Sequence, residues 1–98
     1  MNASVEDLYN NSPRAIVFYG NSWCPDCRRA RHVLLDNNIE FLEIDISKDD
    51  KASEFVRLIN HGNKSVPTIV FPDGTILVEP GTSVLLDKIK QIESTSTQ

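Results

Sequence analysis

The segment that decides the fold is "AIVFYGNSWCPDCRRAR", residues 15–31. It opens with a continuous apolar run rich in β-branched and aromatic residues, which is typical of a strand buried on both faces. From Pro25 the pattern becomes helical and continues as far as Asn37 and Asn38, which are suited to end a helix. The segment therefore predicts a strand that turns directly into a helix, with both cysteines of the chain at the turn.

The rest of the chain predicts further strands and helices. Leu42, Ile44 and Ile46 would share one face of the second strand. Ser47 and Asp50 resemble a capping box at the start of the second helix, and the turn "PDG" separates two short apolar runs of a hairpin. The expected strands lie at 15–20, 40–46, 68–71 and 75–79, and the expected helices at about 25–37, 47–60 and 82–92, with at most a short helical turn at 5–9 and a frayed end at 94–98.

The order β-α-β-α-β-β-α determines the expected fold class. Strands joined through a helix run parallel with a right-handed crossover, and the closing hairpin adds an antiparallel edge. We therefore expect an α/β protein with a four-stranded mixed sheet flanked by helices. The 98 residues suffice for a single domain, 1–98, with its core at about 14–92.

Composition argues against several classes of partner. The formal net charge is −4, so the chain lacks the excess of positive charge that favours nucleic acid. No stretch approaches the ~18 apolar residues that span a membrane, and the first fifteen residues lack the pattern of a secretory signal. We expect a cytoplasmic monomer that binds neither nucleic acid nor membrane.

The cysteine spacing narrows the chemistry. Cys24 and Cys27 are the only cysteines, and a disulfide between them would close too short a loop to stabilise the fold much. A zinc site needs four ligands, and His32 and His61 follow no ligand pattern, so we expect no bound metal. A redox pair explains the spacing best. An iron–sulfur cluster bridged by a dimer, through Cys24 and external thiols, is an alternative of another class.

The local sequence gives the two sulfurs different chemistry. Pro25 suits the first position of a helix, which makes Cys24 the N-cap residue. There the unpaired N–H groups and the positive end of the helix dipole favour a thiolate. Cys27 lies nearly one turn further along and should be more buried and less ionised. Cys24 is thus the predicted attacking thiol and Cys27 the predicted resolving thiol.

Charged residues follow the pair on the same helix. Arg28 lies four residues after Cys24 and is a candidate to stabilise a thiolate or bind substrate. Arg29 and Arg31 are expected on a solvated face. Asp26 in the first turn stabilises the helix but disfavours a nearby thiolate. We expect the N-cap position and Arg28 to outweigh Asp26.

Two motifs together resemble a known family. "WCPDC" follows the predicted buried strand, and "SVPT" comes about forty residues later. With the block "EFVRLINHGNKSVPTIVFPDGT" and a proline after the last strand, they are similar to motifs of the glutaredoxin and thioredoxin superfamily, and most similar to mycoredoxin-type glutaredoxins. The resemblance covers roughly residues 15–80 and implies a thioredoxin-like fold.

The resemblance also implies roles for individual residues. It implies a cis bond between Val66 and Pro67, with the Val66 backbone pairing with the cysteinyl part of a bound thiol or peptide. It further implies that Lys64 meets a substrate carboxylate or sugar and that Trp23 shields the site. The expected thiol-binding residues are Trp23, Pro25, Arg28, Lys64, Val66 and Pro67.

The activity that the resemblance implies is thiol–disulfide oxidoreduction of mixed or protein disulfides, with mycothiol or glutathione as the small co-substrate. "VEPGTS" departs from the Gly-Gly and acidic residues with which glutathione-using members hold glutathione, and "CPDC" departs from the Pro-Tyr of common glutaredoxins and the Gly-Pro of thioredoxins. The identity of the thiol and the redox potential therefore stay open. A second possibility is a redoxin that a thioredoxin-reductase-type flavoenzyme reduces directly.

Overall fold

The computed structural model describes residues 13–96, so the helical turn predicted at 5–9 lies outside the described residues. The described chain forms, in order, β1 (Val17–Gly20), α1 (Pro25–Asp36), β2 (Leu42–Asp45), α2 (Asp50–Ile59), β3 (Thr68–Val70), β4 (Ile76–Val78) and α3 (Thr82–Ser96). The predicted order of strands and helices is confirmed. Within these residues, no helix is both long and apolar enough to cross a membrane.

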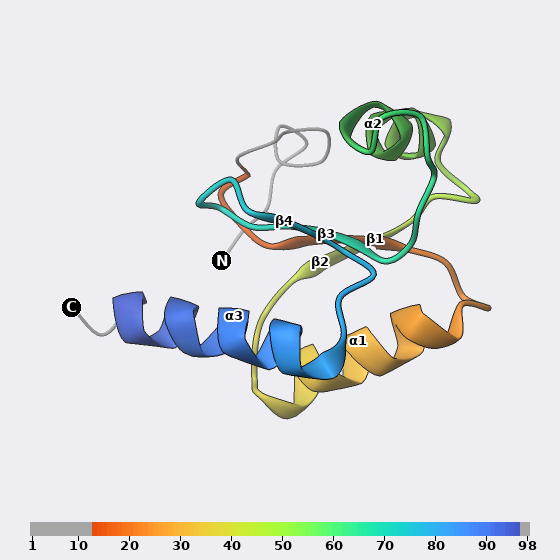
Figure 1. Ribbon diagram of the computed structural model, residues 1–98. Coiled ribbons are helices and arrows are strands. Elements are labelled where there is room, and N and C mark those ends of the chain that lie inside the picture. The colour runs from red at the N-terminus through yellow and green to blue at the C-terminus, as the bar shows by residue number, and fades with distance from the viewer. Residues whose placement is uncertain (1–12, 97–98) are drawn as a thin grey trace.

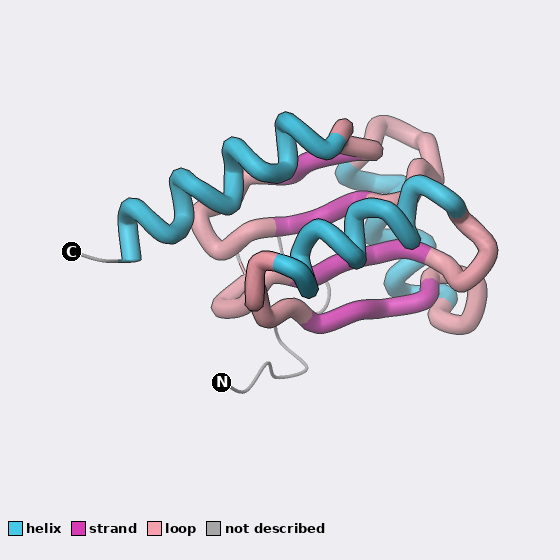
Figure 2. Tube along the Cα trace, turned by 90° about the horizontal axis from the view of Figure 1, so that it is seen from below, coloured by secondary structure: helices cyan, strands magenta, loops and turns pink. Residues whose placement is uncertain are grey.

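The strands form one mixed sheet in the order β2-β1-β3-β4. β1 runs parallel to β2 and antiparallel to β3, and β3 pairs with β4 in the antiparallel hairpin. Helices α1 and α3 cover one face of the sheet and α2 covers the other (Figure 1), and the view from below shows α1 and α3 side by side over the strands (Figure 2). This arrangement is the predicted four-stranded thioredoxin-like fold.

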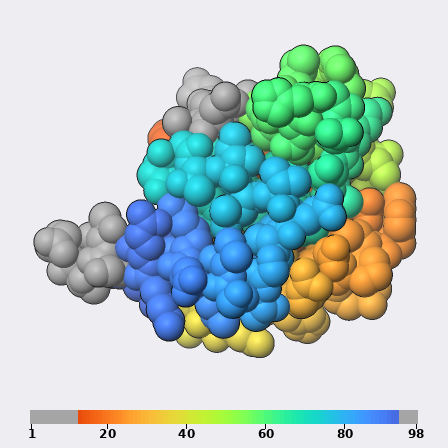
Figure 3. Space-filling view, in the orientation of Figure 1, coloured from red at the N-terminus to blue at the C-terminus, as the bar shows by residue number. Residues whose placement is uncertain are grey.

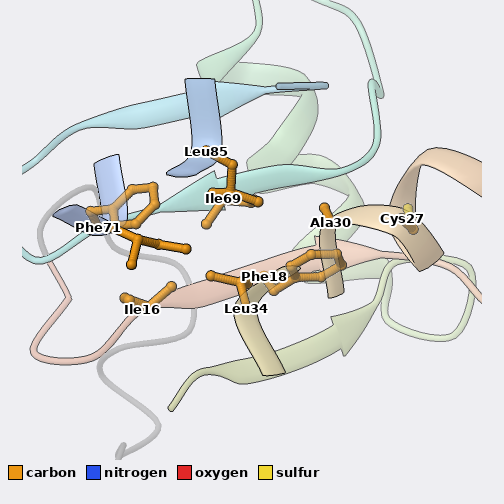
Figure 4. Close-up of a cluster of buried hydrophobic side chains, with 9 residues drawn as sticks. Ile16, Phe18, Cys27, Ala30, Leu34, Ile69, Phe71 and Leu85 are labelled. Carbon is orange, nitrogen blue, oxygen red and sulfur yellow. The ribbon is translucent and has the colours of Figure 1, made fainter. Parts of the chain in front are cut away.

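Alternation along β1 supplies side chains to two cores, because successive residues point to opposite faces of a sheet. Val17 and Tyr19 join the α2 side, where they pack with Ala52, Val56 and Val70. Phe18 belongs to the larger core between the sheet and α1 and α3. Its buried members are Ile16, Phe18, Cys27, Ala30, Leu34, Ile69, Phe71, Leu85 and Ile89, and Cys27 lies at one end of them (Figure 4).

The start of α2 differs from the prediction. The N-cap is Asp49, whose carboxylate accepts a hydrogen bond from the Ala52 N–H at 3.0 Å. The Ser47 hydroxyl instead bonds to the Asp45 carboxylate at 2.6 Å, so the predicted capping box of Ser47 and Asp50 is wrong. Aspartate is among the best N-cap residues, and Asp49 stands at the position from which its side chain reaches the free N–H groups.

The C-terminal helix is longer than predicted, and the strands are shorter. α3 extends to Ser96 rather than ending near Ile92, because neither glycine nor proline follows Ile92 to stop it. The strands are shorter than predicted by a residue or two at their ends, although single backbone hydrogen bonds, such as that from Phe71 N–H to the Thr75 carbonyl at 2.9 Å, continue beyond them. These shifts leave the order and pairing of the elements unchanged.

A buried lysine joins the β3–β4 hairpin to α3. The side chain of Lys88 is 8% exposed, and its Nζ donates hydrogen bonds to Asp73 at 2.6 Å, Thr75 at 3.0 Å and Gln91 at 2.8 Å. The ammonium also lies 5.2 Å from the centre of the Phe71 ring. The hydrogen bond from Lys88 lowers the pKa of Asp73 to about 2. The charge of Lys88 is thus fully partnered despite its burial.

Candidate redox site

The turn between β1 and α1 places Cys24 as the N-cap of the helix. Its backbone is extended, with φ −84° and ψ 117°, and Pro25 occupies the first helical position. The Cys27 N–H donates to Cys24 Sγ at 3.1 Å, so the sulfur accepts the hydrogen bond that a serine or aspartate oxygen ordinarily accepts at this position. The N-cap geometry predicted from "CPDC" is confirmed. The Cys24 residue is partly exposed.

Cys27 lies one turn deeper and is fully buried. Burial and a side-chain hydrogen bond with Cys24 raise the pKa of Cys27 to about 12. A backbone hydrogen bond with Asn21 and the positive charge of Arg31 act in the opposite direction. The Cys27 thiol is therefore protonated at neutral pH, as the sequence predicts for the more buried sulfur.

Gly20, the last residue of β1, makes the burial of Cys27 possible. A Cβ atom at Gly20 would lie 2.9 Å from Cys27 Sγ and 2.9 Å from Phe18 Cε1, closer than such contacts occur. Only a residue without a side chain lets the sulfur approach the end of the strand. Gly20 was predicted only as the end of a strand; the available signal for its role is a glycine at the strand end four residues before the first cysteine.

The loop before β3 brings backbone to the accessible sulfur. The Val66–Pro67 peptide bond is cis, as the resemblance implies. The Cys24 thiol lies 3.8 Å from the Val66 carbonyl oxygen, within reach of a long S–H···O contact. In Figure 3 the orange start of α1 and the green-to-teal segment leading into β3 meet at the surface. Cys24, Cys27, Val66 and Pro67 therefore converge on one site.

Hydrogen bonds fix this loop to its neighbours. The Thr68 hydroxyl donates to the Ser65 carbonyl oxygen at 2.7 Å and accepts from the Asn60 side-chain amide at 3.0 Å. The Glu79 N–H donates to the Pro67 carbonyl oxygen at 2.8 Å. Asn60 was predicted only as part of a helix end. Its contact with Thr68 in β3 cannot be predicted from the local sequence pattern.

Arg29 on α1 is exposed, as predicted, and it also makes two polar contacts. Arg29 forms an ion pair with Asp26 at 2.9 Å and donates to the Pro80 carbonyl oxygen at 3.4 Å, so it joins α1 to the segment before α3. The carboxylate of Asp26, which was expected to disfavour a Cys24 thiolate, therefore has a positive partner. Asp26 is thus compensated by Arg29.

Arg31 is the arginine of α1 whose charge acts to lower the pKa of the buried Cys27 thiol. Its guanidinium binds both carboxylate oxygens of Glu43, with Nε 2.9 Å from each, and lies 5.7 Å from the centre of the Phe18 ring. The positive charge that acts on Cys27 is that of Arg31. The side chain of Arg31 is 25% exposed, so it lies at the edge of the predicted solvated face, where β2 supplies a carboxylate beside it. Arg28, predicted as the tuning charge, is exposed.

The remaining predicted residues lie at the surface. Trp23 is 65% exposed, and Pro25 and Lys64 are also exposed. The pKa of Glu54 is lowered by its hydrogen bond with Arg57 and, less strongly, by the charge of Lys64. The shielding role of Trp23 and the substrate contact of Lys64 stay predictions.

Metal binding has little support in the described part of the chain. Among residues 13–96, no three histidine, cysteine, aspartate or glutamate side chains converge to form a metal site. The two cysteines are free thiols. A cluster held by Cys24 would need ligands from outside residues 13–96.

A family model described as glutaredoxin matches residues 16–76. This chain belongs to the glutaredoxin family. A Mycobacterium tuberculosis protein provisionally named a glutaredoxin is 38% identical over 78 residues, which are 80% of this chain and 93% of that protein. Mycoredoxin 1 of Corynebacterium glutamicum is 34% identical over 77 residues, covering 79% of this chain and 95% of its own.

A solved structure extends the likeness to three dimensions. The glutaredoxin of Archaeoglobus fulgidus superposes with a TM-score of 0.67 at 30% identity, covering 78% of this chain and 87% of that chain. Glutaredoxins are in general thiol–disulfide oxidoreductases. In the present glutaredoxin, one partly exposed sulfur lies at a helix N-terminus and one buried sulfur lies a turn away.

Proposed function

We propose that this glutaredoxin reduces mixed disulfides between proteins and a small thiol, as well as protein disulfides. The observation that supports this most strongly is the asymmetry of the thiols. Cys24 is partly exposed beside the Val66 carbonyl, whereas Cys27 is fully buried with a raised pKa. Thiol–disulfide exchange depends on the thiolate fraction and on access, and the burial and raised pKa of Cys27 both count against it as the attacking sulfur.

The proposed reaction has two exchange steps. The Cys24 thiolate attacks one sulfur of the substrate disulfide, a Cys24–substrate disulfide forms, and the displaced thiolate takes a proton. Cys27 then loses its proton and attacks Cys24 Sγ, which forms the Cys24–Cys27 disulfide and releases the second substrate thiol. Two electrons pass from the cysteine pair to the substrate. A small thiol from solution can replace Cys27 in the second step.

Substrate binding in this proposal uses the loop before β3. The Val66 backbone would pair with the cysteinyl part of the bound thiol, and the exposed Trp23, Arg28 and Lys64 would contact the rest. The co-substrate is mycothiol or glutathione. Mycothiol is favoured by the likeness to mycoredoxin 1 and by "VEPGTS", which lacks the Gly-Gly of glutathione-using members.

The cysteine pair and the loop before β3 also support a compartment and an oligomeric state for the proposed activity. One close cysteine pair suits a reducing compartment, which supports a cytoplasmic location. Both sulfurs and the loop belong to one chain, so a monomer suffices for the reaction. Protein partners would be oxidised targets and, in the alternative route, a thioredoxin-reductase-type flavoenzyme.

The decisive experiment is the intact mass of Cys27→Ser after incubation with the disulfides of mycothiol, glutathione and bacillithiol. We expect one adduct, on Cys24, and its added mass names the thiol. Cys24→Ser is the control and should gain none. On protein–thiol mixed disulfides Cys27→Ser should keep its activity, whereas on protein disulfides it should stall as a covalent complex. Activity that survives in Cys24→Ser would contradict the assignment.

Two further measurements separate the alternatives. If a flavoenzyme and NADPH reduce the oxidised protein without a small thiol, the direct route is supported. Iron-dependent colour in anaerobically purified protein would instead support a cluster that bridges two chains. We expect neither in a protein that takes its electrons from a small thiol.

A further inference from the structure

An ion pair lies beside the redox helix and is not used in the reaction described above. Arg31 projects from α1 and Glu43 from the edge strand β2, twelve residues later in the chain. Arg31 Nε lies 2.9 Å from each Glu43 oxygen, and its Nη2 donates at 2.5 Å to one of them. The side chains are 25% and 36% exposed. The carboxylate therefore holds the guanidinium in one place.

That place lies on the same side of α1 as the buried thiol. Arg31 lies four residues after Cys27, so both share a face of α1. Phe18 connects them, because its ring lies 5.7 Å from the guanidinium carbon while its Cε1 and Cys27 Sγ both lie 2.9 Å from the point where a Gly20 Cβ would be. The guanidinium and the sulfur are thus neighbours of the same buried ring.

Few other charges reach Cys27. On α1 the titratable group that acts on it besides Arg31 is Cys24. β1 contributes the apolar ring of Phe18, and the turn after β1 contributes a backbone hydrogen bond from Asn21. α3 packs against the same core through Leu85 and Ile89, which carry no charge. From β2, Glu43 acts through the arginine that it binds.

We propose that Arg31 is a positioning residue of the redox reaction, which stabilises the Cys27 thiolate in the resolving step, and that Glu43 holds Arg31 there and limits its effect. The proposal rests on the proposed function. In that step Cys27 loses a proton, its thiolate forms a bond to Cys24 Sγ, and the bond from Cys24 to the substrate sulfur breaks. The departing thiolate takes up a proton, so the step needs no further oxidant.

The roles of the two charges predict opposite effects of their removal. Without the guanidinium, the thiolate of Cys27 loses its positive neighbour. In Glu43→Gln the amide oxygen still accepts a hydrogen bond from Arg31, so the arginine keeps its place and its charge while the opposing negative charge disappears. A pair that merely joined α1 to β2 would give the same sign for both substitutions, because either one would break the same contact.

The test is a single-turnover reaction of the reduced protein with an aromatic disulfide whose thiol is coloured. A first release of colour reports the attack of Cys24, and a second reports the resolving attack of Cys27. The second rate is measured against pH in Arg31→Gln, Arg31→Lys and Glu43→Gln. The matched controls are Arg57→Gln and Glu54→Gln, which remove an exposed arginine–glutamate pair on α2, across the sheet.

We expect Arg31→Gln to slow the second release about twofold and Glu43→Gln to speed it about twofold. A shift of about half a pH unit in the ionisation of Cys27 changes its thiolate fraction about threefold, and the accompanying change in nucleophilicity offsets part of this. Arg31→Lys should restore most of the rate. The differences should shrink as salt is added, because the pair is partly exposed. The controls should match the unmodified protein.

Other outcomes identify which proposal fails. If both substitutions slow the second release, or neither changes it, while the first release is normal, Arg31 has no electrostatic role and the proposed function stands. If the first release is not specific to Cys24, the proposed function itself fails. Unfolding curves of each variant separate a loss of stability from a change in rate.

Discussion

Each end of the core buries a titratable group, Lys88 at one end and Cys27 at the other, and the surroundings of the two groups differ. At the hairpin end, Lys88 is 8% exposed and its ammonium has three hydrogen-bond acceptors and an aromatic ring. At the thiol end, Cys27 is fully buried, and burial is the main reason why its pKa rises to about 12. The fold gives the buried charge of Lys88 hydrogen-bond partners, whereas it keeps the buried thiol of Cys27 neutral.

The largest effect is expected from closing the space that Gly20 leaves for the thiol. In Gly20→Ala the added Cβ would lie 2.9 Å from Cys27 Sγ and Phe18 Cε1, so the helix or the ring must shift. We expect the free energy of unfolding to fall by about 2–3 kcal/mol. Denaturant unfolding of the reduced protein measures it.

The control for this change is Gly81→Ala. No heavy atom lies within 4 Å of a Cβ built there, so the loss should stay below about 1 kcal/mol. Equal losses in the two variants would mean that the thiol end tolerates added volume as well as the surface does, contrary to the close packing of Gly20 against Cys27.

The hairpin end is tested by Asp73→Asn, which removes the charge that Lys88 binds. We expect a loss of about 1–2 kcal/mol near neutral pH, reduced from a fully buried pair because the Asp73 side chain is half exposed. The pKa of Asp73 is about 2 in the folded protein and about 3.9 unfolded, so its contribution is present above about pH 4 and is lost as pH falls toward 2.

The pH dependence of stability makes this prediction specific. Unfolding at a series of acidic pH values should show that Asp73→Asn loses less stability on acidification than the unmodified protein. Asp87→Asn, on an exposed position of α3, should keep the full acid dependence. Parallel acid curves for the unmodified protein and Asp73→Asn would show that the ion pair does not contribute to folding.

The smallest effect is expected from the hydrogen bond that supports the loop before β3. Asn60→Ala removes the amide that donates to the Thr68 hydroxyl and should cost about 0.5–1 kcal/mol. Because Thr68 also holds the Ser65 carbonyl, the second-order rate of Cys24 with disulfides should fall as well. Asn63→Ala, at an exposed neighbour, should leave that rate unchanged. An unaltered rate in Asn60→Ala would separate the loop from the reaction.

Local patterns in the sequence were enough to predict the order of the elements and the position of the two cysteines at the start of α1. The apolar run before "CPDC", the proline at the first helical position and the periodicity of the later segments predict the order of elements and the N-cap sulfur. The cis bond at Val66–Pro67 followed from the resemblance. Each of these depends on residues that are close together in the chain.

The contacts that escaped prediction join distant segments. From its sequence context Arg31 is expected at a solvated helical position, but in the fold Glu43 of β2 lies beside it. Lys88 is expected to be exposed on any helix, and it is buried because the hairpin turn supplies acceptors for it. Asn60 ends a helix by its local pattern and also reaches β3. Periodicity contains no information about such partners.

The unequal cover of the sheet has a consequence for local unfolding. Among the described residues, α2 is the one helix on its face, over the smaller core, whereas α1 and α3 share the other face and are joined through Arg29 and Pro80. Detaching α2 exposes less apolar surface than detaching α1, so it should be the more frequent opening. Amide hydrogens of α2 should exchange with deuterium before those of α1. Each such opening also releases Asn60 from Thr68, so the loop before β3 loosens while the helix with the thiols stays folded.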